Sequence, residues 1–367
     1  MLPYYIQKLQ VKNFRNLEEQ IIEFSPSINC IFGENGNGKT NILEAIYYLI
    51  KRKSFRKNTS FPQILGIDGE RPEISFQSLF INSESSEPIP FSGKWDQAGT
   101  HWFVDNKSTN RKLQVGVVFI NPFDAQGFHL SASSRRTWID DHLGQLDSNY
   151  KKALGRFTKS LRFRNKLLST KPANYRKQIR AIDEEMSELS INLTFSRQKF
   201  LEELRPLVKK SFYDLFSEEH DLEIVLDTKI SGMTKESYLE MCQKNLPKDE
   251  IIGHTHYGIH KDDYVLLFDG LNSFDYCSLG QQKMSYLSLL FAYIELFRYK
   301  FNSFPIVLLD DVSGELDKLR WQNLVAYLNE RKFQVLITTA NDSFKEVLDT
   351  LEGANKLMVS SGSIAKM

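Results

Sequence analysis

The feature that most constrains this chain is the run Gly33 to Thr40, which reads GENGNGKT. It fits the phosphate-loop pattern GxxxxGK[ST] and stands in the required context, behind an apolar run at 27–32 and ahead of a helical pattern at 41–50. Glycines let successive backbone N–H groups wrap phosphates, and the helix N-terminus adds partial positive charge. The residues expected to bind ATP are Gly33, Glu34, Asn35, Gly36, Asn37, Gly38, Lys39, Thr40 and Asn41.

ATP bound in this way requires magnesium, whose carboxylate ligand is expected at the end of an apolar strand. The run at 306–309 ends in Asp310 and Asp311 and supplies such a strand. We expect Lys39 to reach the β and γ phosphates, and Thr40 and Asp310 to contact Mg²⁺. Asp311 is expected to polarise the attacking water, and its short side chain predicts slow hydrolysis. Lys39, Asp310 and Asp311 are therefore the expected catalytic residues.

A second anion site is expected where Ser278-Leu279-Gly280-Gln281-Gln282-Lys283 opens a helix that extends to about Tyr299. Two such sites in one chain do not usually reach the same γ-phosphate, so Ser278, Gly280 and Gln281 are expected to contact ATP held by a second copy. The loop 313–317 would lie at the same dimer interface. The alternative for Ser278 is a simple N-cap of the helix.

A basic stretch is the main indication of nucleic acid binding. Residues 151–180 contain eleven Lys or Arg and no Asp or Glu, whereas the whole chain has a formal charge of only +1. Such a patch binds phosphates independently of sequence, and the alternative is a solvated helix face. A smaller patch follows the phosphate-loop helix. The DNA-binding candidates from the two patches are Lys53, Arg56, Lys57, Lys151, Lys152, Arg156, Lys159 and Arg162.

The order of the patterns predicts an α/β fold built from two separated halves. Residues 1–125 are expected to form the N-terminal half of an ATPase head, with the phosphate loop and an antiparallel side sheet at 74–104. Residues 126–252 are expected to form a compact helical arm, and residues 253–367 the C-terminal half of the head. Three scattered cysteines and the lack of a long apolar segment or signal peptide favour a cytoplasmic protein without membrane contact.

Several motifs resemble those of the RecF family within the ABC and SMC-type head ATPases, and the resemblance spans essentially the whole chain. They are the runs at 11–17, 33–45, 135–140, 164–168, 258–263, 278–283 and 308–317. Ile259, Lys261, Leu279 and Lys283 depart from the usual family pattern, as does the run 312–314.

The resemblance implies an ATP-dependent DNA-binding protein that dimerises on ATP, binds gapped or junction DNA and helps to load the RecA recombinase. RecO and RecR are the partners that it implies, and hydrolysis of ATP would reset the DNA-bound dimer. Arg15 and the run 54–56 match basic positions near the nucleotide or DNA face of that family.

Three other interpretations can be compared with the sequence. A transporter-type ATPase would carry a histidine after the last core strand, where this chain has Thr338 and Thr339. A scaffold regulated by ATP without hydrolysis is also compatible with the motifs. His254, His256 and His260, with Asp262 and Asp263, would provide ligands for a metal site.

Overall fold

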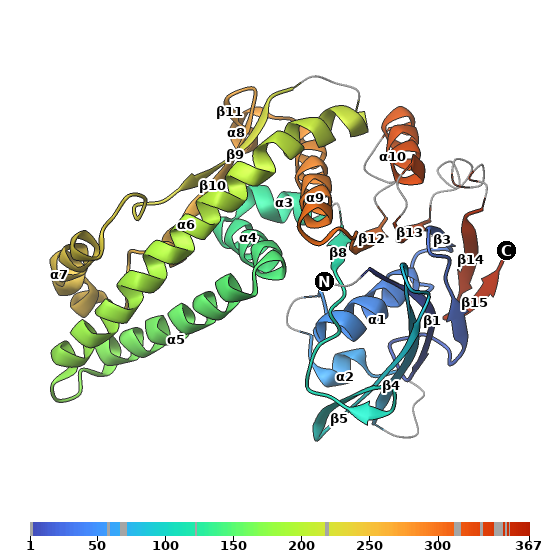
Figure 1. Ribbon diagram of the computed structural model, residues 1–367, viewed down its shortest axis with the longest axis horizontal. Helices are drawn as coiled ribbons and strands as arrows, with labels where there is room; N and C mark the ends of the chain where they lie inside the picture. Colours follow the sequence, from blue (N-terminus) through green and yellow to red (C-terminus); the bar gives the residue numbers. More distant parts are fainter. Residues whose placement is uncertain are drawn as a thin grey trace. The chain divides into compact units, whose positions relative to one another are not determined.

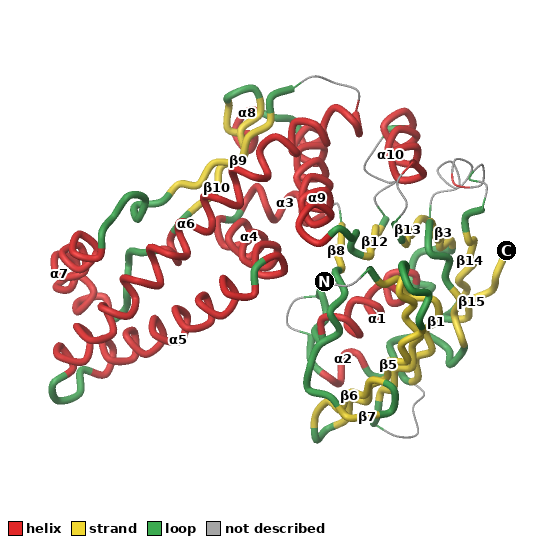
Figure 2. Tube along the Cα trace, in the orientation of Figure 1, coloured by secondary structure: helices red, strands yellow, loops and turns green. Residues whose placement is uncertain are grey.

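A computed structural model describes residues 3–56, 59–66, 72–121, 123–216, 220–311, 317–330, 333–340, 348, 351 and 353–367. The chain forms two compact units, each made from separated segments. The head unit comprises Met1–Asp124, Tyr213–Glu218 and Ile294–Met367, and the arm unit comprises Ala125–Phe212 and Glu219–Tyr293. Figure 1 labels the elements of both units and Figure 2 colours them by type.

The centre of the head unit is a largely parallel sheet of six strands. Its order is β15 (Ser363–Lys366), β14 (Asn355–Ser360), β3 (Ile28–Phe32), β13 (Val335–Thr339), β12 (Ile306–Asp310) and β8 (Val117–Ile120). Every residue of β3, β12 and β13 is buried, as expected for apolar strands covered on both faces. Since these three strands are parallel neighbours, their carboxyl ends meet at one edge.

An antiparallel sheet forms the second layer of the head unit and confirms the predicted side sheet. Its order is β2 (Ile21–Glu23), β1 (Tyr4–Lys12), β4 (Ile74–Asn82), β5 (Pro88–Asp96), β6 (Gly99–Val104) and β7 (Lys107–Ser108). Helix α1 (Lys39–Lys51) contacts the parallel strands and also buries Tyr48, whose ring stacks on Phe76 and Trp95 at 5.5 and 5.1 Å. One core thus joins both sheets to α1 and fixes the helix that follows the phosphate loop.

Among the described residues, the head unit also contains helix α2 (Phe61–Ile64) and helix α10 (Lys318–Glu330).

The arm unit consists of long helices and a small antiparallel sheet. Its helices are α3 (Phe123–Leu130), α4 (Ala132–Leu146), α5 (Ser148–Thr170), α6 (Tyr175–Phe216), α7 (Lys235–Ile252), a 3₁₀ turn at Ile259–Lys261, α8 (Ser273–Tyr276) and α9 (Leu279–Phe301). Three of these helices, α3, α6 and α9, have some of their residues in the head unit. Its strands are β9 (Leu222–Asp227), β10 (Asp263–Phe268) and β11 (Leu271–Asn272). No helix in the described parts of the chain combines the length and apolar composition of a membrane span.

The division between head and arm differs from the three parts expected from the sequence. Residues 253–293, expected in the C-terminal half of the head, belong to the arm unit. The cause is β10, which pairs over its whole length with β9 from Asp263–Asp227 to Phe268–Leu222.

Candidate functional site

The phosphate loop leaves the buried strand β3 and enters α1, as its sequence predicts. Two glycines are required by its geometry. Gly33 has φ of 151°, and a Cβ there would lie 2.3 Å from the carbonyl oxygen of Val359. Gly38 has φ of 110°, and a Cβ there would approach Asn16 Oδ1 to 2.9 Å. Larger residues at either position would clash or strain the loop.

Lys39 is the first residue of α1, and its side chain turns back over the loop. Its Nζ donates hydrogen bonds to the carbonyl oxygens of Gly33 and Glu34 at 2.7 and 2.9 Å. Burial lowers the pKa of this ammonium group, and the nearby Asp311 and Asp310 oppose that shift. The head unit therefore holds a buried cation at the place where a phosphate loop binds its anion.

Thr40 and Asp310 meet across 270 positions of sequence, as predicted. Thr40 Oγ1 donates to Asp310 Oδ1 at 2.8 Å, and Thr338 Oγ1 donates to the same oxygen at 2.8 Å. Burial raises the pKa of the Asp310 carboxyl, while the two hydroxyl donors lower it. A hydroxyl and a carboxylate side by side form the hard oxygen donor set that Mg²⁺ prefers, so these residues fit the ion.

Asp311 follows β12 in a left-handed conformation, with φ of 49°. Its backbone N–H donates to Thr338 Oγ1 at 3.0 Å, and Asp311 lines the same pocket as Asp310. The pocket encloses about 260 Å³. Its lining residues are Asn35, Gly36, Gly38, Lys39, Thr40, Asn41, Arg56, Asp310, Asp311 and Thr338.

A buried glutamate that the sequence analysis did not identify organises one wall of this pocket. Glu44 is fully buried in α1 and pairs with Arg15 at 2.9 Å and with Arg56 at 3.2 Å. Arg56 also donates to Asn41 Oδ1 at 2.8 Å. Arg56, a DNA-binding candidate from the sequence, thus lines the nucleotide pocket. Glu44 could have been identified from the sequence, because it is a carboxylate in a helical run, 42–50, whose other residues are apolar.

Side-chain amides continue this wall to the loop itself. Asn41 Nδ2 donates to Asn16 Oδ1 at 2.7 Å, and Asn16 Nδ2 donates to the carbonyl of Gly36 at 3.1 Å. Asn16 lies in the turn after β1, so the family-like run at 11–17 contacts the phosphate loop directly.

The second expected anion site lies in the arm unit, at the start of α9. Ser278 Oγ accepts from the backbone N–H of Gln281 at 3.2 Å, and Gln281 Oε1 accepts from the N–H of Ser278 at 3.0 Å. Ser278, Gly280 and Gln281 are exposed or partly exposed. Ser278 therefore is an N-cap, and it also presents its hydroxyl at a helix N-terminus that is open to solvent.

Buried side chains hold the segment 273–277, directly before Ser278, in place. Gln282 Nε2 donates to the carbonyls of Ser273, Phe274 and Cys277, each at 3.2 Å. His129, also buried, contacts the Gln282 carbonyl at 3.0 Å and Ser273 Oγ at 3.1 Å through its two ring nitrogens. Burial lowers the pKa of this imidazole.

The DNA-binding candidates of the arm all lie on α5 and are exposed at the surface: Lys151, Lys152, Arg156, Lys159 and Arg162. Arg156 forms a salt bridge with Glu185 at 2.8 Å. In the head unit, Lys53 is exposed, Lys57 lies outside the described residues, and the neighbouring Arg52 stacks on Trp102 at 4.9 Å. Of the loop expected at 313–317, only Asp317 is described, and it accepts a bond from the N–H of Arg320.

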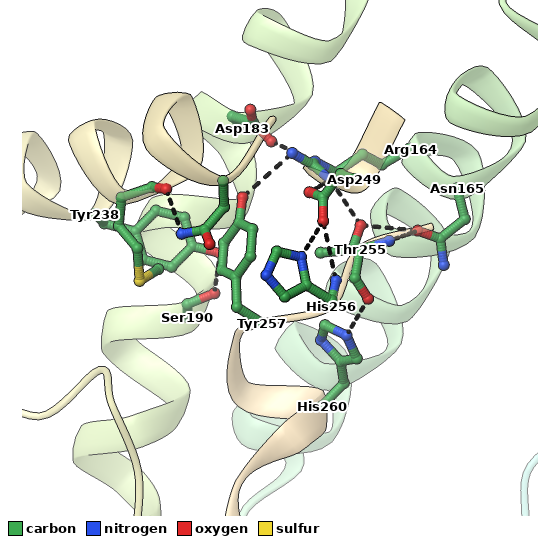
Figure 3. A network of polar contacts seen from close by, with 12 residues as sticks. Arg164, Asn165, Asp183, Ser190, Tyr238, Asp249, Thr255, His256, Tyr257 and His260 are labelled. Atoms are coloured by element: carbon green, nitrogen blue, oxygen red, sulfur yellow. Dashed lines mark hydrogen bonds and ion pairs between the residues drawn. The ribbon is translucent and has the colours of Figure 1, made fainter. Parts of the chain in front are cut away.

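Arg164 belongs to the basic stretch but is fully buried, which the charge count did not reveal (Figure 3). It donates to Asp183 and Asp249, both at 2.7 Å, and joins α5 to α6 and α7. Further bonds reach Thr255 at 2.7 Å and Tyr257 at 3.2 Å. Its role is to hold the arm helices together.

The histidines considered as metal ligands have protein partners instead. His256 contacts Asp249 at 2.5 Å, and His260 contacts the carbonyl of Thr255 at 3.2 Å (Figure 3). Asp262 pairs with Arg197 and Asp263 with Arg135. Within the described ranges, no group of three or more His, Cys, Asp or Glu side chains is arranged to hold a metal ion.

A buried parallel sheet with a phosphate loop after one strand and a carboxylate after another, beside an antiparallel sheet, defines an ATPase head of the ABC and SMC type. The family described as RecF/RecN/SMC N terminal domain matches residues 5–360. This chain belongs to that family and, within it, to the RecF proteins.

Similarity to individual proteins extends over nearly the full chain. The DNA replication and repair protein RecF of Halalkalibacterium halodurans is 30% identical over 374 residues, with 99% of each chain covered. The protein of the same name from Staphylococcus carnosus is 29% identical over 346 residues, which cover 92% of this chain and 93% of the relative.

Solved structures agree with this placement. A structure of the recombination mediator protein RecF with ATP, in the RecFOR pathway, has a TM-score of 0.86 at 25% identity and covers 100% of this chain and 98% of its own. The Smc head domain of Pyrococcus furiosus has a TM-score of 0.58 at 17% identity, with 99% and 96% covered, and this similarity concerns the fold alone.

Proposed function

We propose that this chain is an ATP-dependent DNA-binding protein with weak ATPase activity, which dimerises when it binds ATP and acts on gapped or junction DNA during recombinational repair. The observation that carries the proposal is the bond of Thr40 to Asp310 beside Lys39 in one pocket. A chain with only a DNA-binding role has no need to bring these three side chains together. The proposal also rests on the RecF relatives, whose names concern DNA replication and repair.

In this proposal the phosphate loop binds the triphosphate through backbone N–H groups, and Lys39 exchanges its bonds with loop carbonyls for the β and γ phosphates. Thr40 and Asp310 would hold Mg²⁺, which would supply neutralising charge to the phosphate oxygens. Asp310 is already aligned for this task by the hydroxyl of Thr338.

Asp311 is the proposed base that orients the attacking water. It lines the pocket and follows β12 in a left-handed conformation, whereas Asp310 accepts hydrogen bonds from Thr40 and Thr338. Because an aspartate reaches less far than a glutamate, proton transfer to it is less favourable and hydrolysis is slow. Slow turnover suits a switch whose ATP-bound form must persist on DNA.

The γ-phosphate is proposed to be bound by two copies of the chain at once. Ser278, Gly280 and Gln281 of a second copy would approach it with the N-terminus of α9, whose partial positive charge favours an anion. Ser278 N–H and Oγ are presently occupied by Gln281 in a local cap. Dimerisation would therefore depend on the triphosphate and cease after hydrolysis.

The DNA-binding surface is proposed to include the exposed face of α5. Lys152, Lys159, Arg162 and Lys166 follow one another at intervals of seven, three and four residues, which places them on one side of the helix. All four are exposed, and none has a salt bridge among the residues that the structure describes. The row extends over roughly 21 Å of helix, given 1.5 Å per residue.

The partners proposed are mediator proteins of the RecR and RecO type, with which the chain would help to load recombinase on single strands. This part of the proposal rests on the RecF relatives, one of whose structures is assigned to the RecFOR pathway. A pull-down of RecR by the ATP-bound chain on gapped DNA tests it, and equal recovery with ADP would contradict an ATP-dependent assembly.

The test of the function as a whole is binding to a fluorescent gapped duplex, measured by anisotropy across salt with ATP, ADP or no nucleotide. Tight binding should require ATP and should disappear in Lys39→Ala. The double variant Lys159→Gln, Arg162→Gln should lower the slope of log affinity against log salt by roughly two, since each phosphate contact contributes about 0.9. Affinity that is independent of nucleotide would contradict the proposal.

A further inference from the structure

The exposed face of α5 contains one residue that the proposed electrostatics do not explain. Gly155 lies between Lys152 and Lys159, three and four residues from them, and is exposed. It therefore lies midway between the first two cations of the row Lys152, Lys159, Arg162 and Lys166, on the side of the helix that faces solvent. Every other residue of the row is a long cation.

Within the part of the chain that the structure describes, no contact requires a glycine at this position. Gly155 has a helical conformation without positive φ, and a Cβ built on it would have no atom within 4 Å. Glycine in a helix interior is less favourable than alanine because it loses more backbone freedom on folding. The chain thus carries a destabilising residue in open space, where alanine would fit.

The opposite side of the same helix is firmly held. Arg164, on the buried face of α5, bonds to Asp183 of α6 and Asp249 of α7 (Figure 3). Phe157, Leu167 and the fully buried Leu168 pack on that side as well. Because the buried side of α5 is held in place, the exposed side is a fixed surface. Its own side chains determine how closely a ligand can approach the helix.

We propose that Gly155 is the point at which the sugar-phosphate backbone of a nucleic acid approaches α5 most closely. This inference rests on the proposed DNA-binding function and specifies the contact within it. Phosphates bound by Lys152 on one side and Lys159 on the other draw the backbone across position 155. A side chain there would hold the backbone away and lengthen both charge contacts, whereas glycine lets it lie against the helix.

The test compares Gly155→Ala and Gly155→Leu in the full chain, using anisotropy with a gapped duplex in the presence of ATP. Gly155→Ala should raise the melting temperature by roughly 1–4 °C. The same variant should weaken DNA binding about threefold, and Gly155→Leu about tenfold or more, because loss of close backbone contacts removes both positioning and charge neutralisation. Greater stability with poorer binding is the signature of a glycine retained for a ligand.

The matched control is Gly127→Ala in α3, where an added Cβ also has no atom within 4 Å. This variant should gain stability without any change in DNA affinity. If Gly155→Leu binds DNA as well as the unchanged chain while Lys159→Gln does not, the inference is wrong and the proposed function stands. If the unchanged chain does not bind DNA, the proposed function fails first.

Discussion

The buried arginine of the arm provides a quantitative test of the structure. Arg164 is fully buried, with Asp183 8% exposed and Asp249 fully buried, so Arg164→Met would leave two carboxylates without their cation. Removal of one partner from a buried ion pair costs about 3–5 kcal/mol of folding free energy. For a unit of roughly 160 residues, each kcal/mol lowers the melting temperature by about 2–4 °C, so a decrease of roughly 6–20 °C is expected.

The control for Arg164 is an arginine with equally good geometry at the surface. Arg176 is 67% exposed and binds Glu250 through two nitrogens at 2.7 and 2.8 Å. Because exposed pairs contribute less than about 1 kcal/mol, Arg176→Met should change the melting temperature by about 2 °C or less. Circular dichroism at a helix wavelength measures both variants.

A rescue experiment distinguishes whether Arg164→Met loses stability through unpaired charge or through lost packing. Adding Asp183→Asn and Asp249→Asn to Arg164→Met removes the stranded charges and should recover part of the lost stability, because neutral amides cost less to bury than carboxylates. If Arg164→Met melts within 2 °C of the unchanged chain, the network of Figure 3 does not hold the arm together and the reasoning is refuted.

Three further predictions concern the nucleotide pocket and acid stability. Thr40→Val should raise the magnesium concentration needed for half-maximal ATP hydrolysis at least tenfold while leaving the melting temperature nearly unchanged; an unaltered requirement would remove Thr40 from the metal site. Arg56→Gln should weaken ATP binding in the absence of DNA, as measured with a fluorescent analogue, because Arg56 lines the pocket; a loss confined to DNA binding would contradict this. Burial lowers the pKa of His260 to about 4, so the unfolded chain binds more protons between pH 4 and 6.5 and acid destabilises the fold there, by up to about 3 kcal/mol. His260→Asn should lose stability less steeply than the unchanged chain from pH 6.5 to 4, and parallel curves in urea titrations would exclude the effect.

Local patterns were sufficient to predict that the phosphate loop and the end of β12 lie together. The phosphate loop is recognised from a motif of consecutive residues, and the strand that ends in Asp310 is recognised from an uninterrupted apolar run. Each element is encoded within a short segment of the chain. To predict that the two lie together, only one further rule was needed, namely that the carboxyl ends of parallel strands meet at one edge of the sheet. The bond between Thr40 and Asp310 follows directly.

Contacts between distant segments could not be predicted in this way. The pairing of β9 with β10 assigns residues 253–293 to the arm, yet an antiparallel strand of the arm and a strand of the head have the same alternating pattern. Arg164 counted as one more surface cation because its partners lie 19 and 85 positions away. Its helical phase with Phe157 and Leu168 was the signal that it faces inward.

The proposed function depends on one ATP molecule that is bound by the phosphate loop of one copy and by Ser278 of another. The most direct measurement is light scattering after size exclusion, with a non-hydrolysable ATP analogue and Mg²⁺, of Lys39→Ala, of Ser278→Arg and of their mixture. Each variant alone should remain at the 42.6 kDa of one chain, while the mixture, which retains one complete site, should contain particles of twice that mass. Dimers of Lys39→Ala alone, or a mixture that stays monomeric while the unchanged chain dimerises, would contradict the claim.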